Sequence, residues 1–391
     1  MQAFFNGLSG LFAFSKGLDN VSNNVSNMNT PGYRGSDTFY RSVSDNSGQG
    51  YGAGIAGTEV RTTPGESRQT GNATDMAING SGYFVLRNEL GNYFYTRAGQ
   101  FQIDKDGFLV DSVSQLKVLG IDTSGSLSEI SIKDQRSLPP KPTSKIELVG
   151  SLARSGPTNV THVIQSVQVF DTTGVQQTLK LNFEPQDSPL NSWKVEVQNS
   201  EGVMIHTGEV TFGFDGSPVE GANAVSFTLT TNGTAQEITL DFGKPGSFNQ
   251  AFQVSSGANH TLSARVTDGS AVAGLTGFTF DERGVMKFTY SSGEKKDGSQ
   301  VALADFPDET VLLASKNSLY ETPDSMRPTY GRASEAQFGR IQGGRIELSN
   351  VDLAQEFGDI LIIQRGYQAS SRVMTVSNEM LEQLYNSTRG G

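Results

Sequence analysis

The sequence contains no cysteine, only three histidines and a single tryptophan. Secreted proteins of this size are often cross-linked by disulfides, so the lack of cysteine fits a chain that crosses an export channel unfolded. His162, His206 and His260 are far apart in the sequence, and each lies in a strand-like run. A metal site or a catalytic triad would need the fold to bring them together. We therefore expect no catalytic residue, no metal ligand and no cofactor.

Positive charge is also scarce, with 30 Lys and Arg against 41 Asp and Glu and a net charge of −11. Such an acidic chain argues against nucleic acid or an anionic membrane surface as a partner. No apolar run approaches the roughly 18 residues that a membrane-spanning helix needs. The first charged residue is Lys16, and no uninterrupted apolar segment lies near the start. We therefore expect export without a cleaved signal peptide.

Glycine is abundant, with 45 residues among 391, while apolar residues make up 35% of the chain. The length suffices for two or three domains, and 23 phenylalanines indicate real cores. Between the termini, short runs of alternating apolar residues are separated by turn dipeptides such as Asp215-Gly216, Asn232-Gly233 and Asp268-Gly269. This pattern predicts a mainly β fold for the middle of the chain.

The two ends of the chain follow a different, seven-residue period. Near the C-terminus the recurring residues are Leu353, Ile360, Tyr367, Met374 and Leu381, with Ile363 and Leu384 three residues after two of them. Near the N-terminus they are Phe4, Leu11, Leu18 and Val25, with Phe14, Val21 and Met28 in the companion position. Apolar residues at this spacing are typical of a helix that packs along another helix. We therefore expect terminal α-helices, the first over residues 3–28 and the second capped by Ser349 or Asn350.

The first helix combines weak helix formers with a wide apolar surface. Gly7, Gly10 and Gly17 each cost about 1 kcal/mol relative to alanine inside a helix. Seven large apolar side chains lie within residues 4–18, a stripe wider than one partner helix covers. A helix pair inside one monomer is the simpler alternative, but neighbouring subunits are the natural source of the missing packing. We predict an assembly interface made of Phe4, Leu8, Leu11, Leu18, Val25, Leu353, Ile360, Tyr367, Met374 and Leu381.

Because the two ends share one pattern, a nested architecture is the simplest arrangement. A polar, glycine-rich stretch follows the first helix, and a proline-rich stretch near residue 140 reads as a boundary. We predict four parts: a terminal helical coiled-coil domain (1–30 and 349–391), an extended linker segment (31–70), an inner β domain (71–145 and 281–348) and an inserted outer β domain (146–280). The fold class is thus mainly β with terminal α-helices and discontinuous inner domains.

Two motifs with enzymatic associations are better explained as turns and loops. Residues 52–57 (GAGIAG) match a dinucleotide-binding fingerprint, but no apolar strand precedes them and no helix follows. Residues 104–107 (DKDG) place glycine at the fourth position rather than the sixth position of a calcium loop. The sequence therefore favours a structural protein over an enzyme.

Several motifs resemble those of the bacterial flagellar rod and hook proteins, a family of axial proteins. They are residues 23–33 (NNVSNMNTPGY), 75–84 (DMAINGSGYF), 95–101 (YTRAGQF), 349–352 (SNVD) and 364–369 (QRGYQA). The resemblance covers about 1–110 and 340–391, and it leaves the middle of the chain unmatched. The large insertion favours a hook subunit, whereas the Thr30-Pro31-Gly32-Tyr33 form is somewhat closer to rod proteins.

The resemblance implies a structural subunit that polymerises helically into a curved, flexible tube and transmits torque from rod to filament. Its implied location is the extracellular hook of the flagellum. The implied partners are other copies of the chain, the flagellar rod, the hook cap, the hook–filament junction and the export apparatus. Asn20, Asn23, Asn24 and Asn27 are candidates for lining the channel of such a tube. The alternatives are a distal rod subunit or, from another class, a secreted β-rich polysaccharide-binding protein or enzyme, for which Trp193 offers only one aromatic platform.

Overall fold

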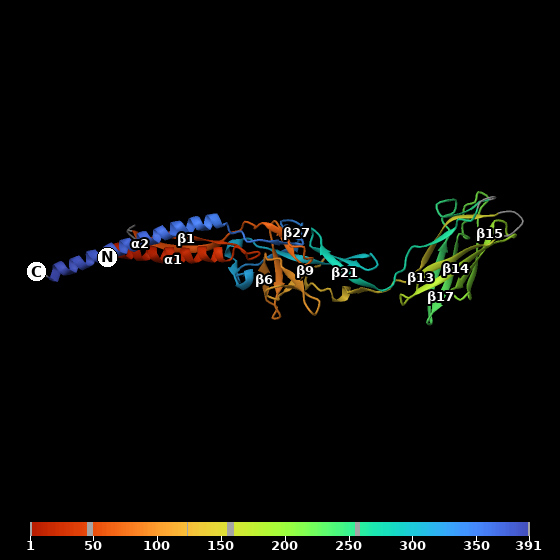
Figure 1. Cartoon of the computed structure of the whole chain (residues 1–391), viewed down its shortest axis with the longest axis horizontal. Coiled ribbons are helices and arrows are strands. Elements are labelled where there is room, and N and C mark those ends of the chain that lie inside the picture. Colours follow the sequence, from red (N-terminus) through yellow and green to blue (C-terminus); the bar gives the residue numbers. More distant parts are fainter. Residues whose placement is uncertain (1, 45–49, 123, 155–159, 255–258, 390–391) are drawn as a thin grey trace. The chain divides into compact units, whose positions relative to one another are not determined.

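The computed structural model describes residues 2–44, 50–122, 124–154, 160–254 and 259–389. The chain divides into two compact units (Figure 1). The first, the helix–sheet unit, comprises residues 1–134, 277–288 and 295–391. The second, the sandwich unit, comprises residues 135–276 and 289–294. The division falls within two strands, β21 (Ala273–Phe280) and β22 (Val285–Tyr290).

The helix–sheet unit contains both terminal helices, α1 (Gln2–Ser26) and α2 (Leu353–Arg389), which lie side by side in Figure 1. The sequence thus correctly predicts the two helices, but not how α2 begins. Asp352 caps α2, because its Oδ1 accepts hydrogen bonds from the backbone N of Ala354 at 2.8 Å and of Gln355 at 3.4 Å. Asn350, one of the two expected caps, instead donates from Nδ2 to the Thr63 carbonyl at 2.7 Å.

A two-stranded antiparallel ribbon follows α1, formed by β1 (Ser36–Ser44) and β2 (Gly50–Val60). The ribbon packs along α1, where Gly52 adopts a φ of 105° and lies against Ser9 and Asn6 with no room for a side chain. The segment predicted as an extended linker therefore contains a ribbon held against a helix.

The main sheet of this unit joins segments that are far apart in the sequence. Its hydrogen-bonded order includes β22-β23-β9-β5-β6-β25-β24, so strands from the two sides of the insertion alternate in one sheet. Tyr83, Tyr95, Phe306 and Tyr320 lie in its core, where their rings pack edge to face. The remaining strands of the unit are β3 (Ser67–Gln69), β4 (Met76–Asn79), β5 (Tyr83–Arg87), β6 (Tyr93–Thr96), β7 (Phe101–Ile103), β8 (Leu109–Asp111), β9 (Lys117–Ile121), β10 (Leu127–Glu129), β23 (Lys295–Asp305), β24 (Leu313–Ala314), β25 (Leu319–Glu321), β26 (Thr329–Arg332), β27 (Arg340–Gly343) and β28 (Arg345–Glu347).

Three short 3₁₀ turns complete the described regular structure: η1 (Lys133–Gln135), η2 (Glu309–Val311) and η3 (Lys316–Ser318). Two small sheets, β4 with β27 and β3 with β28, connect the inner β region to the strand that precedes α2. The helices are therefore attached to the sheet through hydrogen-bonded strands rather than through free chain.

The sandwich unit consists of a four-stranded sheet, β13-β14-β15-β16, and a second sheet, β17-β18-β12-β19, with β20 also paired to β12. Its strands alternate in burial, as in β17, where every second residue from Val225 to Leu229 is buried. The inward residues form one large core that includes Trp193, Phe183, Phe212 and Phe242. The strands are β11 (Ser137–Leu138), β12 (Lys145–Ala153), β13 (His162–Phe170), β14 (Gln176–Pro185), β15 (Ser192–Asn199), β16 (Met204–Thr211), β17 (Ala224–Thr231), β18 (Thr234–Asp241), β19 (Ala251–Val254) and β20 (Ser263–Val266).

Candidate assembly interface

The contact between α1 and α2 is built from small residues. The buried positions of α1 include Gly7, Gly10, Ala13 and Gly17. A Cβ on Gly7 would lie 3.0 Å from the carbonyl oxygen of Ser370 and 3.3 Å from the backbone N of Met374. The glycines that weaken α1 as an isolated helix therefore allow the two helix backbones to approach closely. We call this face the glycine seam.

The residues of the seven-residue pattern lie mostly beside the glycine seam rather than in it. Val21 and Ile363 are buried, at 7% and 8% exposure. The N-terminal residues predicted for assembly (Phe4, Leu8, Leu11, Leu18 and Val25) are all half-buried, as are Leu353, Ile360 and Met374. Tyr367 and Leu381 are exposed, at 47% and 38%. The pairing of the helices within one chain thus leaves much of the predicted interface accessible.

A second set of apolar side chains on α2, of which only Leu384 belongs to the seven-residue pattern, is also exposed. It runs along one face of the helix at intervals of three, four or eleven residues and comprises Ile362, Val373, Val376, Met380 and Leu384. We call it the uncovered stripe. Each of its first three residues directly precedes a residue that is buried or half-buried, so the stripe lies about a quarter turn from the seam.

On α1, Phe5 and Phe12 are likewise exposed, at 56% and 67%. Both belong to the seven large apolar side chains counted within residues 4–18. A similar count along α2, outside the seven-residue pattern, would have added Ile362, Val373, Val376 and Met380. Contiguous exposed apolar surface of this kind marks an interaction site in a soluble protein.

Charged residues fix the first turn of α2 against the ribbon and α1. Glu356 is completely buried and accepts from Arg61 Nη1 at 2.7 Å, and Arg61 Nη2 also donates to Asp37 at 2.7 Å. Asn24 of α1 donates from Nδ2 to the same Glu356 carboxylate at 3.2 Å. The hydrogen bond to Asp37 raises the pKa of Arg61. Burial acts to lower this pKa, and the hydrogen bond to Glu356 raises it further. The guanidinium therefore stays charged, which keeps the buried carboxylate paired.

A second buried ion-pair network lies where the inner sheet meets the strand before α2. Arg97 is 1% exposed and donates from Nε to Glu347 at 2.8 Å, while Arg34 lies 3.7 Å from the same carboxylate. Burial lowers the pKa of Arg97, and burial raises the pKa of the nearby Tyr320 to about 12. Tyr320 therefore stays neutral at neutral pH, and the buried arginines lie against the Glu347 carboxylate, which suits a structural role rather than proton transfer.

The four asparagines considered for channel lining occupy different environments. Asn24 is completely buried, and Asn20 donates from Nδ2 to the Ser36 carbonyl at 2.6 Å at the base of the ribbon. Asn23 is exposed, and Asn27 is half-buried and donates to Asn23 Oδ1 at 3.1 Å. Only Asn23 and Asn27 thus present polar groups on the open side of the helix end.

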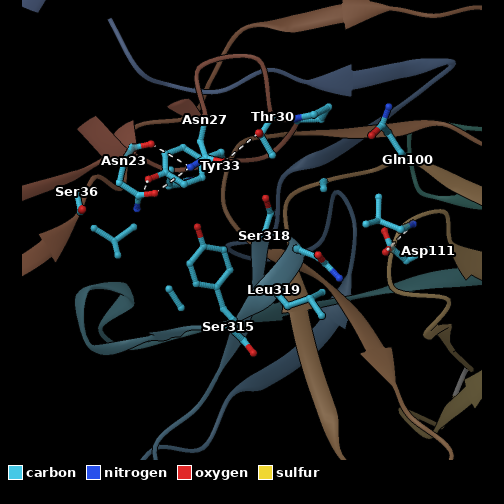
Figure 2. Close-up of a pocket in the computed structure, with 18 residues that line it drawn as sticks. Asn23, Asn27, Thr30, Tyr33, Ser36, Gln100, Asp111, Ser315, Ser318 and Leu319 are labelled. Atoms are coloured by element: carbon cyan, nitrogen blue, oxygen red, sulfur yellow. Dashed lines mark hydrogen bonds between the residues drawn. The ribbon is translucent and has the colours of Figure 1, made fainter. Parts of the chain in front are cut away.

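The polar pocket of the helix–sheet unit has a volume of 450 Å³ and lies at the end of α1 (Figure 2). Figure 2 shows Asn23, Tyr33 and Ser36 on one side of it and Gln100 and Asp111 on the other. Asp111 is the only carboxylate among the described lining residues, and its Oδ2 is occupied by hydrogen bonds from Ser114 at 2.7 Å. The pocket therefore offers no pair of carboxylates and no nucleophile with an adjacent base.

The sandwich unit brings together two of the three histidines. The rings of His162 and His260 have centroids 5.1 Å apart, whereas His206 stacks on Phe227 at 6.4 Å. The expectation that the three histidines stay apart is therefore wrong for one pair, because β13 and the segment before β20 are neighbours in the fold.

Among the described residues, no group of three or more His, Asp or Glu side chains is arranged to hold a metal ion. No described helix has the length and apolar character required to cross a membrane.

Comparisons with known families match most of the chain in four pieces, and the longest unmatched stretch between them is residues 35–76. Residues 5–34 match the flagella basal body rod protein family, and residues 77–137 match the flagellar hook protein FlgE/F/G D1 domain. Residues 143–338, half of the chain, match the flagellar basal body protein FlaE D2 domain. Residues 342–387 match the flagellar basal body rod FlgEFG protein C-terminal family.

Full-length relatives carry the name of the hook protein. The flagellar hook protein FlgE of Brucella suis is 30% identical, over 98% of this chain and 98% of its own length. That of Borreliella burgdorferi is 26% identical, over 98% of this chain and 99% of its own length. The crystal structure of Helicobacter pylori FlgE2 covers 72% of this chain and 99% of its own, with 14% identity and a TM-score of 0.47. The sequence matches favour a hook subunit over a rod subunit.

Proposed function

The chain belongs to the flagellar hook protein family, and we propose that its copies polymerise through the apolar faces of α1 and α2 that a single chain leaves uncovered. It is a structural subunit of the bacterial flagellar hook, and the family is one of structural proteins rather than enzymes. The observation that carries the proposal is the exposure of the uncovered stripe on a helix whose first part is packed against α1 and whose residues 378–388 are exposed all round.

In this proposal the glycine seam serves folding of the single chain, and the uncovered stripe serves assembly of several chains. The seam pairs α1 with α2 inside one chain, with Glu356 fixing the start of α2. The stripe, together with Phe5, Phe12, Tyr367 and Leu381, then contacts other copies. An interface between two different faces of identical subunits generates an open helical polymer when its rotation does not close into a ring. A curved, flexible tube that transmits torque from rod to filament is the polymer we propose.

The remaining predicted parts take their places in the same proposal. The helical termini (1–30 and 349–391) form the inner layer of the tube, and the ribbon within 31–70 supports them. The inner β domain (71–145 and 281–348) and the inserted outer β domain (146–280) form the outer shells. Asn23 and Asn27 face the channel, whereas the buried Asn24 serves as an anchor for Glu356.

The surroundings of the tube follow from the same proposal. One end of the tube contacts the flagellar rod, and the other end contacts the hook cap during growth and the hook–filament junction afterwards. The subunits reach the extracellular hook through the flagellar export apparatus, and the cysteine-free sequence suits passage through an export channel in the unfolded state.

The test is polymerisation of the purified chain, followed by electron microscopy at high protein concentration. We expect tubes from the full chain and none from a chain lacking residues 1–30 and 349–391, whose sandwich unit should keep its β circular dichroism. Tubes from the shortened chain would refute the proposal that the terminal helices hold the polymer together.

A further inference from the structure

The histidine pair of the sandwich unit occupies a defined position that the structural role of the chain does not explain. The His260 ring lies between the His162 ring, with a centroid distance of 5.1 Å, and the buried indole of Trp193, at 5.7 Å. Its edge-to-face angle to Trp193 is 88°. His260 thus covers one end of the large core of the sandwich unit.

Hydrogen bonds define which nitrogen of each ring carries a proton. The backbone N–H of Ala153 in β12 donates to His260 Nδ1 at 3.2 Å, so this nitrogen is unprotonated. His162 Nε2 lies 2.8 Å from the Leu262 carbonyl oxygen, which can only accept, so Nε2 carries its proton. The first bond ties His260 to β12, and the second ties Leu262 to β13. Thr261 and Leu262 are also bound to β12, because their backbone N–H groups donate to the Ser151 carbonyl at 2.9 and 3.2 Å.

A proton added to His260 therefore changes its contact with β12. It binds to Nδ1, which turns the Ala153 contact into two N–H groups that face each other. The new charge also lies beside His162, and the interaction between the two rings lowers the pKa of His260.

The other charged groups near His260 do not compensate that charge. Directly after β12, Arg154 directs its guanidinium to the Gln186 carbonyl at 2.9 Å and to Asp187 at 3.5 Å. On β15, Lys194 pairs with Glu196 at 2.6 Å. Trp193, which packs against the ring, is uncharged and donates to Gln253 of β19 at 2.9 Å. Burial first, and then His162, lower the pKa of His260 below 6.5. The neutral, bonded form therefore holds at neutral pH and is lost as the pH falls below that value.

We propose that His260 is an acid-sensitive latch, whose protonation breaks its contact with β12 and exposes the part of Trp193 that its ring covers, while Thr261 and Leu262 stay bonded to Ser151. The latch is closed at neutral pH and opens reversibly as the pH falls. It provides a hook subunit with a reversible change confined to one unit, without loss of the helical contacts that we propose for the polymer.

Trp193 is the only tryptophan in the sequence, so its fluorescence reports on the latch in the full chain. We expect the emission of the dilute monomer to shift to longer wavelength between pH 7.5 and 4.8, with a midpoint below 6.5 and full reversal. Amide hydrogen exchange, corrected for intrinsic rates, should increase in parallel for Ala153, whose N–H loses its acceptor. A spectrum and an exchange pattern that stay constant over this range would overturn the proposal.

Three variants assign the change to the proposed residue. His162→Gln removes the neighbouring charge and should move the midpoint upward, whereas His206→Gln, the matched control in the same unit, should leave it unchanged. His260→Gln should abolish the transition. If His260→Gln fails to fold, the first two variants still test the proposal. A transition midpoint that shifts in His206→Gln but not in His162→Gln would contradict it.

Discussion

The sandwich unit and the terminal helices treat their apolar residues in opposite ways. In the sandwich, Trp193, Val195 and Val197 are completely buried, since consecutive core layers close over them. In α2, Ile362 and Met380 are 67% and 64% exposed, while glycine occupies much of the facing seam. A unit that buries its own large side chains is complete by itself. A helix pair that packs through glycine and exposes its large side chains is complete only when something else covers them.

The difference predicts that core truncation damages only the sandwich unit. Trp193→Ala should lower the free energy of unfolding of that unit by about 3–5 kcal/mol, because it removes a completely buried indole that also bonds Gln253. Urea denaturation followed by circular dichroism measures this loss. Phe214→Ala is the control, because its ring is 96% exposed, and it should change stability by less than about 0.5 kcal/mol. Equal effects from the two substitutions would mean that the core does not dominate the stability of this unit.

In the glycine seam, adding a side chain rather than removing one should destabilise the helix pair, because the space between the helices is already filled. Gly7→Leu should cost about 1–3 kcal/mol of helix pairing, because backbone atoms of Ser370 and Met374 occupy the space. Gly358→Ala in α2 is the matched control, since a Cβ there meets no heavy atom within 4 Å, and better helix propensity should stabilise the helix by about 1 kcal/mol. Hydrogen exchange of the α1 and α2 amides measures both. Unchanged protection in Gly7→Leu would place the contact between the helices elsewhere.

The buried pair of Glu356 and Arg61 should contribute somewhat less, because Asp37 remains as a second partner for Arg61. Glu356→Gln should lower the melting temperature of the helix pair and cost about 1–2 kcal/mol. Asp19→Asn, at the exposed pair of Lys16 and Asp19, should have no measurable effect. Thermal scans followed at 222 nm compare the two, and a larger loss from Asp19→Asn would contradict the assigned role of burial.

The smallest expected effect concerns acid stability in the sandwich unit. The hydrogen bond from the Thr173 hydroxyl lowers the pKa of Asp171 from its usual 3.8. Burial acts to raise this pKa, and hydrogen bonds from the backbone N–H groups of Val175 and Thr173 lower it further. This contribution to stability is complete above pH 3.8 and is lost as the pH falls through the lower, folded-state pKa. Asp171→Asn should therefore flatten the decline in melting temperature between about pH 4 and pH 2.5. A decline as steep as in the unchanged chain would exclude Asp171 as a source.

Much of the architecture was predictable, because period and turn chemistry are local properties of the sequence. The helices, the β-rich middle and turns such as Asn232-Gly233 follow from spacing alone, and the structure contains them. The glycine seam was not predictable from apolar spacing, since glycine carries no hydropathy signal and reads only as a weak helix former. The ion pair of Arg61 with Glu356 joins residues almost 300 positions apart, and such contacts leave no local pattern.

The candidate interface was predictable in location but not in detail. Seven-residue spacing identified both helices, yet it could not say which residues the chain covers by itself. Val21 and Ile363 prove to be buried within one chain, whereas Ile362, one position away, is exposed. A one-residue difference moves a side chain by about 100° around a helix, so the assignment needs the three-dimensional pairing of the helices.

The most direct test of the account is sedimentation of polymer formed by the variant Ile362→Asp/Met380→Asp. Both residues belong to the uncovered stripe, so two charges per subunit would enter the proposed contact between copies. We predict that this variant keeps the melting temperature of the monomer and forms no sedimenting tubes. The control Val203→Asp/Met204→Asp, at exposed positions of the sandwich unit, should still form them. Normal tube formation by the stripe variant would contradict the claim that the uncovered stripe holds the hook together.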